Sequence, residues 1–140
     1  MVLALGVELQ SALKRTYKHR VNFDHTERLL YGHDVGSLPK LVKPIFGNTT
    51  PSAIVQPSSE DEVVTLVRWA DQHRVRLTPR GKATSGYGGV LPLHQAVVVD
   101  LFRMKDVLDI DVGQQTVSVQ PVFSRASAGN SLTVSSSLAA

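Results

Sequence analysis

The residues best suited to chemistry in this 140-residue chain lie in one glycine-rich segment, Pro79 to Gly89. The segment contains four glycines, three hydroxyl side chains and two cations. Because glycine has no Cβ, such a loop can adopt positive φ and approach a bulky ligand closely. Successive backbone N–H groups can then form a concave nest that binds an anion, typically a phosphate. The segment therefore predicts a loop that cradles a diphosphate.

Spacing excludes two better-known phosphate loops. The mononucleotide P-loop requires Ser or Thr directly after Gly-Lys, whereas Gly81-Lys82 is followed by Ala83. The dinucleotide fingerprint requires a third glycine three residues after Gly88, and Leu91 stands there. Taken alone, the segment is also compatible with a glycine-rich loop that binds no ligand.

A strand–helix–strand unit is expected to position this loop. Ala53 to Gln56 predicts a first strand, which Pro57 closes. Ser59, with Glu62 three residues on, has the capping-box pattern and starts a helix that runs to about His73. Arg76 to Thr78 predicts the second strand, which leads into the loop. The apolar stripe of the helix comprises Val63, Leu66, Val67 and Ala70, with Trp69 beside it in the core.

Further elements are expected on both sides of this unit. Gly6 to Arg20 predicts an amphipathic helix, and Ala96 to Leu101 a strand covered on both faces. Val107 to Asp111 and Thr116 to Gln120 alternate around Val112-Gly113-Gln114, which predicts a β-hairpin.

The stretch between the first helix and the first strand is expected to be irregular. Val21 to Gly36 resembles a loop, and Pro39 and Pro44 favour an extended lead-in. Two aspartates and two histidines occur here, but their spacing fits no compact metal-ligand motif, so no metal site is predicted. They are Asp24, His25, His33 and Asp34.

Composition restricts the function classes. The net charge of +3 is spread along the chain, which argues against a nucleic-acid surface. Cysteine is absent, which excludes disulfides, thiol nucleophiles and iron–sulfur ligands within these residues. The apolar start, Met1 to Leu5, is too short to insert into a membrane. A cytoplasmic location is expected.

From Pro51 to Pro121, the order of motifs resembles the flavin-binding domain of the vanillyl-alcohol oxidase and p-cresol methylhydroxylase (PCMH) superfamily. Within this superfamily, the motifs resemble those of FAD-linked oxidoreductases of the glycolate oxidase and D-lactate dehydrogenase group. The residues that carry it are Pro51-Ser52-Ala53-Ile54-Val55-Gln56-Pro57, Ser59-Glu60-Asp61-Glu62-Val63, Pro79-Arg80-Gly81, Thr84-Ser85-Gly86, Val97-Val98-Val99-Asp100-Leu101, Met104 and Thr116-Val117-Ser118-Val119-Gln120-Pro121.

The resemblance implies an α+β fold with an α/β-like lobe: an N-terminal helix, then the first βαβ-plus-hairpin lobe of a PCMH-type domain. Residues 1–50 would be the helix and lead-in, residues 51–121 the incomplete first lobe, and residues 122–140 a disordered tail rich in Ser and Ala. FAD would be the cofactor. The implied diphosphate contacts are Arg80, Gly81, Lys82, Ala83, Thr84, Ser85 and Gly86.

Two of these positions depart from the all-glycine loop common elsewhere in the family. Ala83 is tolerated there if its φ is negative, and Lys82 either screens phosphate charge or points to solvent. A small-molecule substrate, a 2-hydroxy acid or similar, would bind only in the intact protein. The segment Lys82 to Gly89, with Tyr31 to Lys43, resembles a subgroup that carries an iron–sulfur region. No catalytic residue is assignable.

The resemblance stops at Pro121, where a Ser- and Ala-rich stretch replaces the expected helix. A shifted reading frame is one hypothesis for this break, and a genuine alternative ending is another. The chain is thus expected to be a truncated fragment that binds FAD. Two alternatives remain open: a catalytically inactive remnant, and a stand-alone module that binds an anion or a nucleotide.

Overall fold

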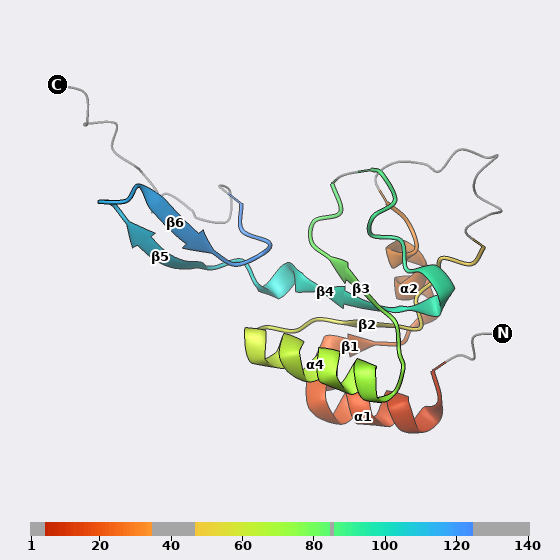
Figure 1. Ribbon diagram of the computed structural model, residues 1–140. Helices are drawn as coiled ribbons and strands as arrows, with labels where there is room; N and C mark the ends of the chain where they lie inside the picture. Colours follow the sequence, from red (N-terminus) through yellow and green to blue (C-terminus); the bar gives the residue numbers. More distant parts are fainter. Residues whose placement is uncertain (1–4, 35–46, 85, 125–140) are drawn as a thin grey trace. The chain divides into compact units, whose positions relative to one another are not determined.

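The computed structural model describes residues 5–34, 47–84 and 86–124 (Figure 1). These residues form two compact units, Met1–Arg103 and Met104–Ala140, whose boundaries include the residues outside the described ranges. The first unit holds a mixed sheet with its helices, and the second holds a hairpin. Each unit is described by itself below.

The first unit begins with the predicted amphipathic helix. α1 spans Val7–Tyr17 and continues into a short 3-10 helix, η1, at Lys18–Arg20. Leu13 and Tyr17, four residues apart, are its buried side chains, as expected for one face of a helix. The chain then enters β1, Val21–Asn22, at the edge of the sheet.

The predicted strand–helix–strand unit is present. β2 spans Ala53–Val55, α4 spans Glu60–Gln72 and β3 spans Leu77–Arg80. The Ser59 hydroxyl accepts a hydrogen bond from the Glu62 N–H, which confirms Ser59 as the N-cap. The Glu62 carboxylate caps the N–H of Ser58, one residue earlier than the standard capping box requires.

The sheet has the strand order β1-β2-β4-β3. β4, Val97–Asp100, follows a 3-10 turn, η2, at Leu93–Gln95 and lies between β2 and β3. It pairs in parallel with both neighbours, Val97 facing Ala53 on one side and Leu77 on the other. All four of its residues are buried, which confirms the strand covered on both faces.

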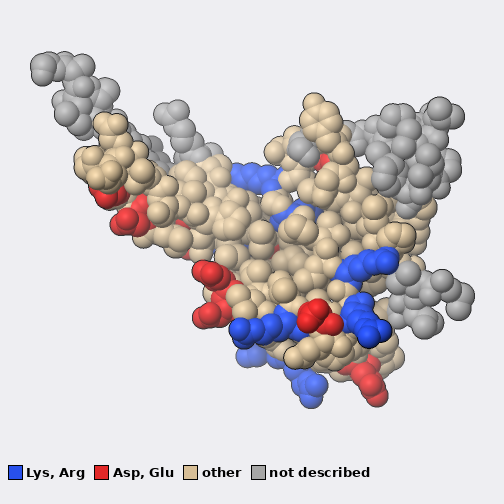
Figure 2. Space-filling model, viewed as in Figure 1, with Lys and Arg blue, Asp and Glu red and all other residues tan. Residues whose placement is uncertain are grey.

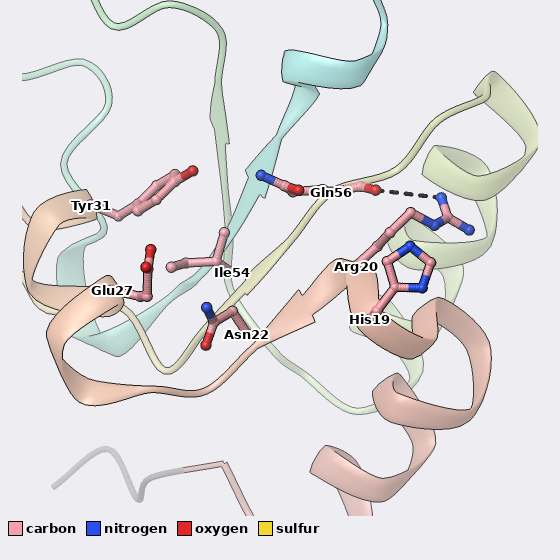
Figure 3. A pocket seen from close by; sticks show the side chains of 7 residues that line it. All are labelled: His19, Arg20, Asn22, Glu27, Tyr31, Ile54 and Gln56. Atoms are coloured by element: carbon pink, nitrogen blue, oxygen red, sulfur yellow. Dashed lines mark hydrogen bonds between the residues drawn. The ribbon is translucent and has the colours of Figure 1, made fainter.

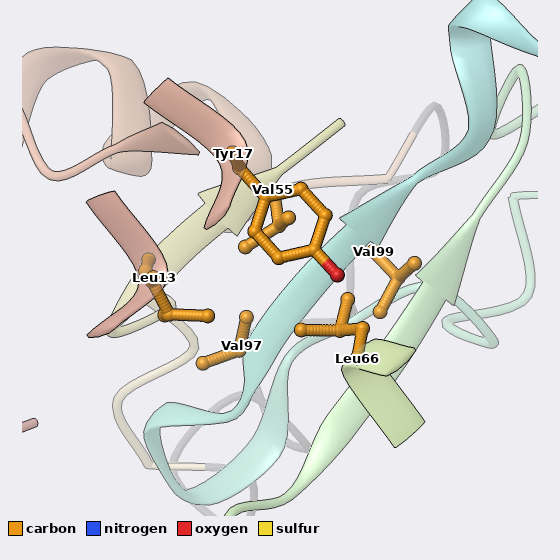
Figure 4. Close-up of a cluster of buried hydrophobic side chains, with 7 residues drawn as sticks. Leu13, Tyr17, Val55, Leu66, Val97 and Val99 are labelled. Carbon is orange, nitrogen blue, oxygen red and sulfur yellow. The ribbon is translucent and has the colours of Figure 1, made fainter. Parts of the chain in front are cut away.

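One face of this sheet carries the main apolar core (Figure 4). α1 and α4 lie side by side against it in Figure 1, and Trp69 of α4 packs at the margin of the core. Val67, predicted within the apolar stripe, is instead half exposed. The buried members of the core are Leu13, Tyr17, Ala53, Val55, Leu66, Val97 and Val99.

The prediction of an irregular stretch at Val21 to Gly36 is wrong over two segments. Besides β1, it contains a helix, α2, at His25–Tyr31. The Asp24 carboxylate accepts hydrogen bonds from the N–H groups of Thr26 and Glu27, so it caps this helix. Predictions for the Pro39 and Pro44 lead-in lie outside the described residues.

The second unit contains the predicted hairpin. After a 3-10 turn, η3, at Leu101–Arg103, β5 (Val107–Asp111) pairs in antiparallel fashion with β6 (Thr116–Val119). Val122, at the start of the predicted tail, is buried and donates its N–H to the Met104 carbonyl. Residues 125–140 of that tail lie outside the described part of the chain.

No large patch of a single charge is visible on the face shown in Figure 2. On the face shown in Figure 2, acidic and basic side chains lie among one another, in keeping with a net charge of only +3. Among the described residues, no helix is long and apolar enough to cross a membrane, and the 13-residue α4 is the longest of them.

A single ion pair ties η1 to the start of α4. The Arg20 guanidinium binds both carboxylate oxygens of Glu62, and the Tyr17 hydroxyl donates to the Glu62 carbonyl at 2.8 Å. The hydrogen bonds from Arg20, aided by those from Ser58, lower the pKa of Glu62 to about 2. The carboxylate therefore stabilises the fold only while it is charged.

Replacement of Glu62 by Gln should remove an acid-sensitive part of the stability. Because the folded pKa of about 2 lies below the ordinary 4.5, this stabilisation is complete above pH 4.5 and is lost as the pH falls towards 2. The pair is partly exposed, so its contribution is about 1–2 kcal/mol. Urea unfolding at pH 7 and pH 3 measures it.

The matched control is Glu60→Gln, which neutralises an exposed carboxyl in the same first turn of α4. This variant should lose less than about 0.5 kcal/mol at pH 7. An equal loss from both substitutions would show that general charge at the helix start, rather than the pairing with Arg20, produces the effect.

Candidate functional site

The glycine-rich loop begins where the parallel strands end. β2, β4 and β3 run in the same direction, so their carboxyl ends meet at one edge of the sheet. Gln56, Asp100 and Arg80 stand at these three ends, and the loop follows Arg80 directly. In open α/β sheets, ligands bind beyond this edge.

The backbone at the start of the loop offers a row of hydrogen-bond donors. The N–H groups of Gly81, Lys82, Ala83 and Thr84 donate to no other residue in the part of the chain that the structure describes. Gly81, Lys82 and Thr84 are exposed. Neighbouring N–H groups without protein partners are the feature from which an anion-binding nest is built.

Ala83 does not meet the condition under which the sequence argument tolerated it in the loop. Its φ is +53°, whereas the expectation required a negative value. A left-handed alanine costs roughly 1–2 kcal/mol relative to the right-handed conformation. Its methyl group is buried, with 8% of the residue exposed, so packing offsets part of that cost. The loop thus adopts a glycine-type turn without a glycine at this position.

The Arg80 side chain contacts Tyr31 and His33, at the end of α2 and just beyond it. Its guanidinium donates to the carbonyls of His33 at 3.0 Å and Tyr31 at 3.4 Å, and lies 5.0 Å from the centre of the Tyr31 ring. Arg80 therefore fastens the loop to the end of α2, and Lys82 is left as the exposed cation of the loop.

The second half of the loop is held by an acidic side chain. The Asp34 carboxylate accepts a hydrogen bond from the Gly88 N–H at 2.8 Å. Gly86 and Gly88 have φ of +70° and +80°, which favour glycine, and Tyr87 between them is 95% exposed. Ser85, a predicted diphosphate contact, lies outside the described residues.

Asp100 is the one buried charged residue among those described, with 4% exposed. Its Oδ2 accepts hydrogen bonds from the Tyr31 hydroxyl at 2.7 Å and the Gln56 Nε2 at 2.8 Å. Its Oδ1 accepts from the Phe102 N–H at 3.1 Å. A buried carboxyl requires such donors, so this cluster joins α2, β2 and β4 beneath the loop.

Burial raises the pKa of Tyr31 to about 12, and the Asp100 carboxyl adds to the shift. The hydroxyl therefore remains protonated at neutral pH and acts as a hydrogen-bond donor. Asp100 holds the Tyr31 hydroxyl, and the Arg80 guanidinium lies over the Tyr31 ring. Tyr31 is therefore a positioning residue for the loop.

A small polar pocket lies on the outer face of β1 and β2, beside this cluster (Figure 3). Tyr31 and Glu27 reach it from α2, and Gln56 reaches it from the end of β2. Its volume is about 90 Å³. Ligand pockets usually measure roughly 300–1,000 Å³, so this pocket fits a few waters and not a flavin ring.

Sequence reasoning missed the supports of the loop. Tyr31, Asp34, Gln56 and Asp100 were not predicted as site residues. Gln56 and Asp100 lie at the ends of predicted strands, and the carboxyl ends of parallel strands converge. Their positions could therefore have indicated that they lie near the loop. Nothing in the sequence pattern placed Tyr31 or Asp34 near the loop.

Replacement of Tyr31 by Phe should destabilise the chain by about 1.5–3 kcal/mol, because a buried carboxyl loses one of its donors. Tyr87→Phe removes the same atom from an exposed residue of the loop and should change stability by less than about 0.5 kcal/mol. Urea unfolding at pH 7 measures both. Equal stability of the two variants would contradict the supporting role of Tyr31.

Comparison with known proteins identifies the family of this chain. A family model for an FAD binding domain matches residues 51–132, which is more than half of the chain and extends past Pro121. Among solved structures, an alkyldihydroxyacetonephosphate synthase is 28% identical to this chain, with a TM-score of 0.63. The match covers 74% of this chain and 22% of the synthase chain. A p-cresol methylhydroxylase is 20% identical with a TM-score of 0.58, and the match covers 74% of this chain and 20% of the methylhydroxylase chain. At this identity the likeness shows the fold alone.

Curated relatives point the same way. The glycolate oxidase subunit GlcD of Bacillus subtilis (strain 168) is 31% identical over 102 residues, 71% of this chain and 20% of the relative. The mitochondrial D-lactate dehydrogenase [cytochrome] of Arabidopsis thaliana is 32% identical over 114 residues, 81% of this chain and 19% of the relative. The chain spans about a fifth of the length of these relatives. The predicted α+β fold, the family resemblance and FAD as cofactor are confirmed: the chain belongs to the FAD-binding domain family of FAD-linked oxidoreductases.

Proposed function

We propose that the chain supplies the diphosphate-binding part of the FAD site of an oxidoreductase acting on a 2-hydroxy acid. The observation that carries this proposal is a row of N–H groups at the carboxyl edge of the sheet, Gly81 to Thr84, which have no partner within the described ranges. Such donors satisfy phosphate oxygens without any rearrangement of the backbone.

The residues of the loop fit an anionic ligand. Pro79 to Gly89 contains no acidic residue, and Lys82 adds an exposed positive charge. The Asp34 carboxylate, which contacts the loop, accepts a hydrogen bond from the Gly88 N–H. Lys82 would screen the diphosphate, and the exposed Thr84 hydroxyl would add a donor.

The remaining predicted contacts take different roles. Arg80 would act mainly through the loop, because its Nη1 donates to the carbonyls of Tyr31 and His33 and so fastens the start of the loop. Gly86 would let the loop turn beside the ligand, given its φ of +70°. Ser85 stays a predicted contact.

The names of the relatives support the proposed reaction class. Their names include glycolate oxidase, D-lactate dehydrogenase and D-2-hydroxyglutarate dehydrogenase, each named for a 2-hydroxy acid. When bound, the flavin supplies the redox chemistry, and the protein supplies its position and electrostatics. This chain's part is to hold the diphosphate. An iron–sulfur partner region and a cytoplasmic location stay predictions from the sequence.

Calorimetric titration of the chain with FAD, ADP and riboflavin tests the proposal. FAD should bind most tightly, ADP should bind through the shared diphosphate, and riboflavin, which has no phosphate, should bind most weakly. Equal affinity for riboflavin and FAD would contradict a diphosphate-based site. Equal affinity for ADP and FAD would favour a stand-alone nucleotide-binding module.

Two substitutions at Ala83 separate loop conformation from side-chain chemistry. Ala83→Val places a β-branched residue where φ is +53° and should weaken FAD binding at least about tenfold by distorting the loop. Ala83→Gly, the matched control, keeps the conformation available and should change the affinity less than about threefold. The same titration measures both variants. A Val variant with unchanged affinity would show that this turn does not contact the diphosphate.

A further inference from the structure

The hairpin of the second unit has two edges, and neither has a further strand beside it in the described part of the chain (Figure 1). β5 and β6 form a two-stranded sheet, and every residue of β6 is exposed. A sheet of two strands is marginally stable in water, and further strands with an apolar face stabilise it. An added strand at a free edge would therefore stabilise this unit.

The edge of β5 carries features that hinder such pairing. Its pairing shifts register between Val107 and Asp109, as at a β-bulge. Asp109 and Asp111 add two carboxylates to the strand. Bulges and charged side chains are means by which proteins keep an edge strand from pairing with another chain. β5 is therefore a protected edge.

The edge of β6 has no such protection. Thr116–Val119 contains no charged residue, proline or glycine, and it pairs with β5 in continuous register from Thr116 to Ser118. Three of its four residues are β-branched, which favours a strand. Two identical strands can approach at this edge without the like charges that would oppose their pairing. The edge of β6 is thus open to a second copy of this chain.

The hydrogen bonds of the hairpin show which amides of β6 point outward. Gln120, just after β6, donates its N–H to the Asp106 carbonyl on the other strand. Hydrogen-bonding groups of successive residues alternate between the two sides of an antiparallel strand. The amide of Ser118 therefore points to β5, whereas the amides of Val117 and Val119 point to the free edge.

The side chains of the hairpin divide into an apolar and a polar face. Val117 lies opposite Ile110, and Val119, two residues on, shares their face. All three side chains are exposed. Ser118 lies opposite Asp109 on the other face. A strand that pairs with β6 must therefore match both the outward amides and the exposed apolar face.

We propose that β6 pairs in antiparallel fashion with β6 of a second copy of this chain, about a two-fold axis at Ser118. In this register Val117 of one copy faces Val119 of the other, so the outward amides exchange hydrogen bonds. The register also continues the apolar face from one copy to the other, whereas a shift by one residue would join an apolar face to a polar one.

The resulting sheet ends at a β5 strand on each side. Because both of these edges are protected, association stops at a closed, two-fold symmetric dimer. The interface lies within the hairpin and involves no residue of the glycine-rich loop, so it stands or falls separately from the proposed FAD binding.

Sedimentation velocity of the full chain measures this association. The unaltered chain should show a concentration-dependent equilibrium between monomer and dimer. Val117→Pro removes an outward N–H and leaves the hydrogen bonds to β5 in place, so it should weaken dimerisation at least about tenfold. Ile110→Pro is the matched control, because Ile110 lies directly opposite Val117 and its N–H points to the protected edge of β5. It should change dimerisation less than about threefold.

Circular dichroism checks that both proline variants keep the fold of the unaltered chain. An unaltered chain that stays monomeric up to about 1 mM would overturn the proposal. Equal weakening of dimerisation in the two folded variants would overturn it as well.

Disulfide cross-linking tests the register and decides the matter if a proline variant does not fold. The chain has no cysteine, so each single substitution introduces the only thiol. Ser118→Cys places two thiols across the axis in a non-hydrogen-bonded pair, with a Cα separation of about 4.5 Å that suits a disulfide. Thr116→Cys is the control, because its two copies would lie roughly 13 Å apart along the paired strands.

After mild oxidation, Ser118→Cys should migrate as a covalent dimer on a non-reducing gel, and Thr116→Cys should remain a monomer. Equal cross-linking of the two variants, or none with Ser118→Cys, would contradict the proposed pairing of β6 with its copy.

Discussion

The buried carboxyl of Asp100 is the constraint on which the carboxyl edge of the sheet depends. It stands at the end of the central strand, where the protein has excluded water, so its oxygens need protein donors. Those donors come from α2, from the end of β2 and from the turn after β4. One side chain thus fixes three segments that are distant in the sequence.

The glycine-rich loop inherits its position from this cluster. Tyr31, held by Asp100, presents its ring to the Arg80 guanidinium, and Arg80 in turn binds carbonyls at the end of α2. Asp34 fixes the far half of the loop through the Gly88 N–H. Side chains fasten both halves, while the N–H groups of Gly81 to Thr84 have no partners among the described residues. For the proposed diphosphate, a loop fastened in this way would limit the entropy that binding must offset.

Much of the fold could be predicted because its elements have strong local signals. The unbroken apolar run Val97 to Val99 indicates a central strand, and Ser59 marks the start of α4. α2 escaped prediction because its inward face is polar. Its partly buried residues are Arg28 and Tyr31, whereas Leu29 and Leu30 are exposed, so hydrophobic periodicity indicates the wrong face.

The site could be predicted in part. Glycine content and charge identify the loop, but they do not show which way a side chain points. Arg80 stays a predicted diphosphate contact, and the sequence did not indicate that its Nη1 donates to carbonyls of Tyr31 and His33, which α2 brings within its reach. Ala83 was considered tolerable only with a negative φ, yet it is buried in a left-handed turn. Both outcomes depend on tertiary contacts that no local pattern contains.

The most direct test of the account is amide NMR of the isotopically labelled chain during titration with ADP and then FAD. If the loop cradles a diphosphate, the N–H signals of Gly81, Lys82, Ala83 and Thr84 should shift with both ligands and saturate together. Riboflavin should leave these four signals in place. Shifts confined to other segments, with these four amides unmoved at saturating FAD, would contradict the central claim that this loop binds the diphosphate.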